Sequence, residues 1–127
     1  MEHTEEDREL AKLCIKHWKE DILKPLLKAK KRTVNKTAYI DIAAKNCALC
    51  RKYNYSCYNC PLCKEGWGCT ENDSIYQMVD YFSDSDDAGI FVMGDDDLEE
   101  AIHYAKVMIK CLKYIAGLRK TKPVETR

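Results

Sequence analysis

Residues 47–69 read CALCRKYNYSCYNCPLCKEGWGC and contain six of the eight cysteines of this 127-residue chain. This cysteine segment contains two CxxC pairs, Cys47 with Cys50 and Cys57 with Cys60. A CxxC pair presents two thiolates to one metal ion from a single tight turn, and two such pairs complete a tetrahedral site. The sequence therefore predicts a metal-stabilised segment at the centre of the chain.

Two sets of four cysteines compete as ligands. The first combines both CxxC pairs, which only six residues separate, whereas common zinc patterns place about a dozen or more residues between pairs. The second replaces Cys57 by Cys69 and leaves a longer loop, and Cys63 is the least favoured ligand in either set. The predicted ligands are drawn from Cys47, Cys50, Cys57, Cys60 and Cys69.

Zinc is the metal that this pattern favours, because tetrahedral thiolate sites suit zinc or iron–sulfur clusters. The cysteines from Cys57 to Cys63 resemble the start of a ferredoxin ligand run, but five residues precede Cys69 where that run has three. Disulfides are the other alternative, yet the acidic N-terminus MEHTEEDREL is unlike a signal peptide. We therefore expect structural Zn²⁺ in a cytoplasmic protein, with no open position on the metal for catalysis.

Amphipathic helical patterns flank the cysteine segment on both sides. Thr4 is placed to cap the first helix, and Pro25 should end or kink it near Lys24. Asp96 is placed to start the last helix, while His17, beside the first apolar face, is typical of a satisfied histidine rather than a metal ligand. The first apolar face comprises Ala11, Ile15, Trp18, Ile22 and Leu26. The last comprises Leu98, Ile102, Ala105, Ile109, Leu112 and Ala116.

These patterns predict a mainly α fold, in which long N- and C-terminal helices pack together around a central zinc knuckle, with at most a short strand or hairpin. The stretch TAYIDIAA, residues 37–44, fits a strand or a helical turn equally well. We expect one domain, 1–127, with an acidic loop region at 83–97 and a frayed tail at 121–127. Cys14 and Cys111 are expected to fill the core. No apolar run approaches the length of a membrane span, so no membrane partner is expected.

Charge is segregated although the net charge is zero. Residues 12–36 contain nine Lys or Arg against two acids, and residues 71–100 contain eleven Asp or Glu and no Lys or Arg. Such blocks are typical of solvated faces. The functional interpretation is a negative surface for a cationic partner, or pairing with the basic face of a second copy in a homo-oligomer.

The motif order resembles a group of small cysteine-rich bacteriophage proteins, most of them uncharacterised accessory proteins. The motifs are His17-Trp18, CALC, CYNCP, Cys69 and Tyr76, and the resemblance covers residues 14–80. It implies a CxxC…CxxCP zinc knuckle in a helical frame. The chain departs from the group at Cys63, where an apolar or aromatic residue is usual, and in the acidic stretch 83–97. Small phage proteins often counter host defence in the host cytoplasm, by blocking a host protein or sequestering a nucleotide signal.

No catalytic constellation is recognisable. The chain has no GxSxG, HExxH or P-loop motif and no HxE ahead of a PCxxC motif, so we expect a protein that acts by binding and is not an enzyme. Its partner would be a host protein, or a small anionic ligand bound by basic residues of 28–36 or 110–120 with an aromatic ring on its base. The alternative is a zinc-knuckle nucleic-acid-binding protein, because Arg51, Lys52 and Lys64 alternate with aromatic residues. The wholly acidic stretch 71–100 argues against that alternative.

Overall fold

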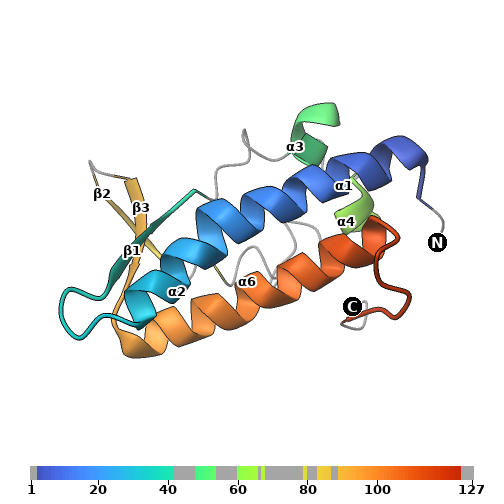
Figure 1. Ribbon diagram of the computed structural model, residues 1–127. Helices are drawn as coiled ribbons and strands as arrows, with labels where there is room; N and C mark the ends of the chain where they lie inside the picture. Colours follow the sequence, from blue (N-terminus) through green and yellow to red (C-terminus); the bar gives the residue numbers. More distant parts are fainter. Residues whose placement is uncertain are drawn as a thin grey trace.

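Two long helical segments lie side by side and antiparallel in the computed structural model (Figure 1). The structure describes residues 3–41, 48–53, 60–65, 67, 79, 83–86 and 89–123. The first segment comprises α1 (Glu5–His17), the π-helix η1 (Trp18–Leu23) and α2 (Lys24–Lys30), and the second is α6 (Asp95–Ile115). Two short helices, α3 (Ala48–Lys52) and α4 (Pro61–Lys64), lie near the N-terminal half of the first segment (Figure 1). The predicted mainly α fold is confirmed.

Helix α1 begins as the sequence predicted. The Thr4 side chain accepts a hydrogen bond from the backbone N–H of Asp7 at 3.1 Å, which satisfies one of the donors left unpaired at a helix start. Glu5, Glu6 and Asp7 occupy the first turn, where the helix dipole favours negative charge. The predicted apolar face is buried along its whole length, from Ala11 to Leu26.

Pro25 changes the helix type but does not end the helix. The proline has no N–H, so the carbonyl of Asp21 loses the donor that an α-helix would place four residues later. That carbonyl accepts instead from the backbone N–H of Asp41, at 3.2 Å. The preceding turn is π-helical, with the Lys24 N–H bonded to the Lys19 carbonyl, and α2 continues to Lys30. The predicted end of the helix near Lys24 is therefore wrong, and the helix instead changes there from π-helical to α-helical geometry.

A three-stranded antiparallel sheet packs at the α2 end, in the order β1-β3-β2. Its strands are β1 (Thr37–Ile40), β2 (Asp84–Asp86) and β3 (Gly89–Met93), with Thr37 opposite Met93. The side chains of Ala38, Ile40 and Val92 are buried, whereas those of Tyr39 and Met93 are exposed. Residues 37–40 of the ambiguous stretch 37–44 are therefore a strand, and residues 42–44 lie outside the described residues.

The prediction that residues 83–97 form an acidic loop region is wrong, because this stretch contributes strands to the sheet. It contains β2, β3 and the first residues of α6, because the apolar residues of β3 pair with β1 far away in the sequence. Helix α6 also begins at Asp95, one residue before the predicted start, and no side chain caps it. Gly94 precedes it with a φ of 89°, a conformation that favours glycine.

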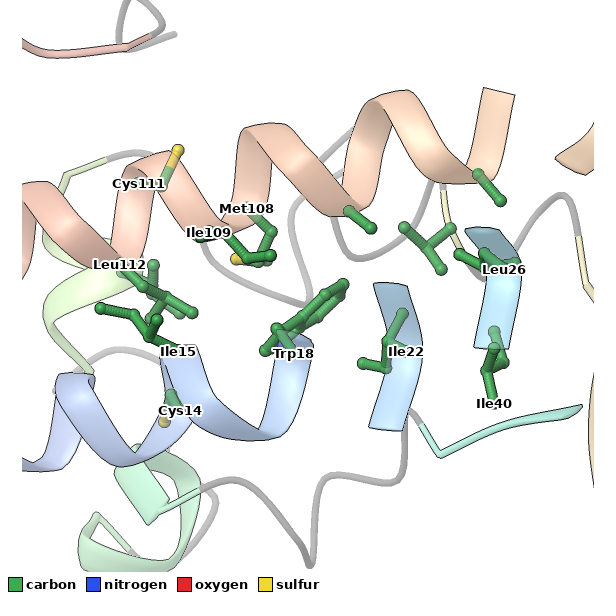
Figure 2. Packing of buried hydrophobic residues seen from close by; sticks show 14 of the residues in the cluster. Cys14, Ile15, Trp18, Ile22, Leu26, Ile40, Met108, Ile109, Cys111 and Leu112 are labelled. Carbon is green, nitrogen blue, oxygen red and sulfur yellow. The ribbon is translucent and has the colours of Figure 1, made fainter. Parts of the chain in front are cut away.

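The core lies between the two long segments, where Ile15 and Trp18 face Ile109 and Leu112 (Figure 2). Cys14 and Cys111 are fully buried within it, as predicted. Burial raises the pKa of the Cys111 thiol to about 12, so that thiol stays protonated. Within the described part of the chain, no helix has both the length and the apolar character needed to cross a bilayer.

Helix α6 ends in a Schellman motif. The N–H of Leu118 bonds to the Lys113 carbonyl at 2.9 Å, and the N–H of Gly117 bonds to the Tyr114 carbonyl at 3.2 Å. Gly117 has a φ of 79°, as this motif requires. The tail 121–127 was predicted to fray, and the structure describes its residues 121–123. Within them, Lys122 forms an ion pair with Glu65.

Candidate functional site

Two of the five predicted metal ligands lie in the described part of the cysteine segment. Cys50 lies in α3 and Cys60 immediately precedes α4, and their exposed fractions are 8% and 6%. Cys63, the least favoured ligand, lies within α4 and is half-buried. The other predicted ligands, Cys47, Cys57 and Cys69, lie outside the described residues. The zinc ligand set therefore stays a prediction.

Asp7 anchors α3, and with it Cys50, to helix α1. Its buried carboxylate accepts hydrogen bonds from the Lys52 ammonium at 2.6 Å and from the Tyr53 hydroxyl at 2.8 Å. Burial acts to raise the pKa of Asp7, but the hydrogen bonds from Lys52 and Tyr53 outweigh it, so this pKa is lowered. The hydrogen bond to Asp7 correspondingly raises the pKa of Lys52. This role of Asp7 was not predicted from the sequence, because Lys52 and Tyr53 lie more than forty residues away along the chain.

Replacing Asp7 by asparagine is expected to lower the free energy of unfolding by roughly 1–3 kcal/mol, the usual cost of disrupting hydrogen bonds to a buried charged group. Because the pKa of Asp7 is lowered in the folded protein, its stabilisation is complete above the ordinary value of 3.8 and is lost as the pH falls through the lower folded value. Urea denaturation between pH 7 and pH 2 measures both effects. The Asn variant should lose less stability below pH 4 than the unaltered protein.

The matched control for Asp7 is Glu9→Gln, on the same helix. Glu9 is 62% exposed and pairs only with Lys12 among the described residues, so its replacement should change stability by less than about 0.5 kcal/mol. Equal losses in the two variants would contradict an anchoring role for Asp7.

A second anchor joins the cysteine segment to α6 and to both ends of the chain. Glu65 and Trp67 follow α4 and are buried, with exposed fractions of 1% and 3%. The Trp67 ring meets Tyr114 of α6 edge to face, with ring centroids 5.8 Å apart. The carboxylate of Glu65 lies 3.0 Å from the Lys122 ammonium and 3.5 Å from the His3 imidazole. The cysteine segment is thus fastened to α1 through Asp7 and to α6 through Trp67.

A pocket of about 480 Å³ lies where α2 faces β1, a size within the usual range for small-ligand sites. Lys24, Lys28 and Arg32 line it at spacings of four residues, which places them along one side of α2 and its end. Among the described residues that line it, Glu20 is the only carboxylate, so these residues contribute three cations and one anion. We call this site the basic pocket. Its lining comprises Glu20, Lys24, Pro25, Lys28, Arg32, Asn35, Thr37, Ala38 and Tyr39.

The basic pocket is also lined by Tyr39 of β1 and by Asn35, which lies in the turn between α2 and β1. Tyr39 is 53% exposed and packs against Phe91 with ring centroids 5.8 Å apart. Asn35 has a φ of 52°, which turns the chain between α2 and β1. The Arg32 guanidinium donates to the Thr37 carbonyl at 3.3 Å, so this cation is directed from the end of α2 toward the strand. The residues that line the pocket thus include three cations and one partly exposed aromatic residue.

Part of this pocket was predicted from the sequence. Residues 28–36 were expected to contribute to an anion site, and Lys28 and Arg32 of that stretch line the pocket. Lys24 lies before that stretch and was not predicted, and Tyr39 was not predicted because no particular aromatic residue was assigned to the base. The other basic stretch proposed, 110–120, does not line this pocket.

Part of the charge segregation is neutralised within the chain. Lys36 pairs with Asp95, and Lys30 lies 3.9 Å from Glu99, so the basic end of the first segment faces the acidic start of α6. These pairs are exposed and contribute little to stability. They nevertheless favour the interpretation of the acidic stretch 71–100 as a solvated surface, because two of its carboxylates pair with basic residues of the same chain.

Comparison of the chain with protein-family models, curated proteins and solved structures finds no match. The fold and the site define a small, mainly helical protein with a basic pocket. Its function is therefore argued from this geometry.

Proposed function

We propose that the protein acts by binding a small anionic ligand of the nucleotide type in the basic pocket, without catalysing its conversion. The observation that supports this proposal is a pocket lined by Lys24, Lys28 and Arg32 together with Tyr39, which is 53% exposed. Arginine pairs with phosphate through two parallel N–H donors, and lysine acts as a point charge. An exposed tyrosine ring offers a surface on which a base stacks. The pocket thus has one element for each half of a nucleotide.

In this proposal, zinc has a structural role. Four thiolates drawn from the cysteine segment would close the metal site and stabilise the fold, leaving ligand binding to the basic pocket. The resemblance to small phage proteins suggests the setting: an accessory protein in the host cytoplasm that counters host defence by sequestering a nucleotide signal.

The nucleic-acid alternative is less well supported by the geometry. It relied on Arg51, Lys52 and Lys64 around the metal, but Lys52 is engaged with Asp7 at 2.6 Å and with Glu6 at 3.4 Å. A paired ammonium is less available to a phosphate. The basic pocket, by contrast, contains three cations and one carboxylate.

The experiment is a calorimetric titration with ADP, AMP, pyrophosphate and adenosine. Reversing two charges, in a Lys28→Glu/Arg32→Glu variant, is expected to weaken ADP binding at least 100-fold, since each charged hydrogen bond contributes about 1.5–3 kcal/mol. Tyr39→Ala should weaken ADP but not pyrophosphate, because only ADP has a base to stack. Affinity should fall only modestly with salt, unlike that of a protein bound to a polyanion.

The matched control is Lys106→Glu/Lys110→Glu, a double reversal at the same spacing on the exposed side of α6. It changes the net charge equally and should leave ADP binding within about twofold, because neither residue lines the pocket. Equal loss in both double variants would show general electrostatic attraction and no pocket. Absence of binding by all phosphate compounds would overturn the proposal.

A further inference from the structure

Three potential metal ligands from two separate parts of the chain meet at the π-helical turn. His17 immediately precedes η1, Asp21 lies within it, and Asp41 follows β1. One ligand atom from each of them lies within 4.8 Å of the other two. Ligand atoms around an ion with bonds of about 2.0–2.2 Å are separated by at most about 4.4 Å. The three atoms are therefore close enough for small rotations of the side chains to bring all of them to one ion.

The backbone brings Asp41 to this turn through the defect that Pro25 creates. Since Pro25 donates no hydrogen bond, the Asp21 carbonyl is available to the N–H of Asp41, which it accepts at 3.2 Å. This bond joins the main chains of the two aspartates directly. π-Helical turns are rare and occur frequently at functional sites. Here the turn and the proline together place a carboxylate from the strand side next to a helical histidine.

The exposed fractions of the His17 and Asp21 side chains differ, and the more exposed Asp21 gives an ion access to the cluster from solvent. The His17 side chain is only 12% exposed, and its Nδ1 lies 2.8 Å from Oδ2 of Asp21, which is 54% exposed. Adjacent ligand atoms in an octahedral sphere with bonds of about 2.1 Å are about 3 Å apart. This His17–Asp21 contact is a hydrogen bond, and its length is close to the spacing of two neighbouring ligands, so an ion would replace its proton. From the sequence, His17 beside the apolar face was interpreted as a satisfied or half-exposed histidine, and the sequence did not indicate that Asp41 approaches it.

We propose that His17, Asp21 and Asp41 form a metal site, separate from the cysteine segment, that binds a divalent first-row cation of the manganese, iron(II) or zinc class. Imidazole suits zinc and iron, and carboxylates suit manganese. Three protein ligands leave positions for water or another ligand. The ion would neutralise both aspartates and link η1 to the end of β1. This site goes beyond the proposed anion pocket, because none of its three ligands lines that pocket.

The test uses Mn²⁺ as the probe, because manganese prefers oxygen and nitrogen ligands to thiolates. The full chain, as purified with its cysteine segment undisturbed, is titrated with MnCl₂, and the resonance of free Mn²⁺ is followed by electron paramagnetic resonance. We expect one bound Mn²⁺ per chain, and at least tenfold weaker binding in Asp21→Asn, Asp41→Asn and His17→Gln. Competition by Zn²⁺ added in equal amount should release the Mn²⁺, since zinc stands higher in the affinity order.

Glu9→Gln is the matched control, because it removes an exposed carboxylate of the same helical segment that belongs neither to the cluster nor to the basic pocket. It should bind Mn²⁺ like the unaltered protein. Circular dichroism verifies folding, and should Asp41→Asn unfold, the exposed Asp21 provides the variant for the test. Absence of Mn²⁺ binding by the unaltered protein, or equal binding by the Asp21→Asn variant, overturns the proposal.

Discussion

Removing zinc with a chelator is expected to unfold the protein. Helices α3 and α4, which flank the proposed metal ligands, have five and four residues, too few to be stable in isolation. Yet Leu49 and Leu62 on these helices are buried in the core, as is Trp67. Structural zinc contributes about 10–16 kcal/mol in zinc-finger peptides, as much as the whole stability of a typical domain, about 5–15 kcal/mol. Circular dichroism with and without chelator should show loss of helix, and elemental analysis should show about one zinc per chain.

Serine substitutions separate the ligands from the other cysteines. Cys50→Ser and Cys60→Ser should lose zinc and folded structure together. Cys111→Ser is the matched control, because its thiol is fully buried within α6 and lies outside the cysteine segment. That variant should retain zinc and lose only about 1–2 kcal/mol. A Cys60→Ser variant with full zinc content, or bound iron with visible absorption, would contradict the zinc assignment.

The long helices could be predicted because their signals are local. Apolar residues at spacings of three and four define the faces that are buried, and the Thr4 cap depends on a residue only three positions away. The buried state of Cys14 and Cys111 follows from the same periodicity. These patterns can be recognised without knowing which distant parts of the chain contact each helix.

The site residues that sequence analysis missed depend on contacts between distant parts of the chain. Asp7 meets Lys52 and Tyr53 across more than forty residues. Strand β1 pairs with β3 across a gap that includes the whole cysteine segment. Strand β1 also contacts α2, and Tyr39 of this strand lines the basic pocket. No local pattern reports such an approach, because pairing between distant strands is set by the tertiary fold.

Pro25 lies between these two cases. The rule that proline disrupts a helix identified the correct position near Lys24. It did not give the outcome, because a helix that packs on α6 on both sides of the proline retains its path. The unpaired Asp21 carbonyl then recruits Asp41. The missing hydrogen bond at Pro25 can be predicted from the sequence, whereas the pairing of the Asp21 carbonyl with Asp41 cannot.

Replacing Trp18 by alanine is expected to lower the free energy of unfolding by about 3–5 kcal/mol, because truncation of a buried aromatic residue leaves a cavity as well as removing apolar contacts. Trp18 is 5% exposed, and its ring lies between the first helical segment and α6 (Figure 2). Leu13→Ala on α1 is the control, since Leu13 is 57% exposed and its loss should cost less than about 0.5 kcal/mol. Urea denaturation of the zinc-loaded proteins measures both values. A loss below about 1 kcal/mol for Trp18→Ala would mean that the two long segments do not pack through this ring.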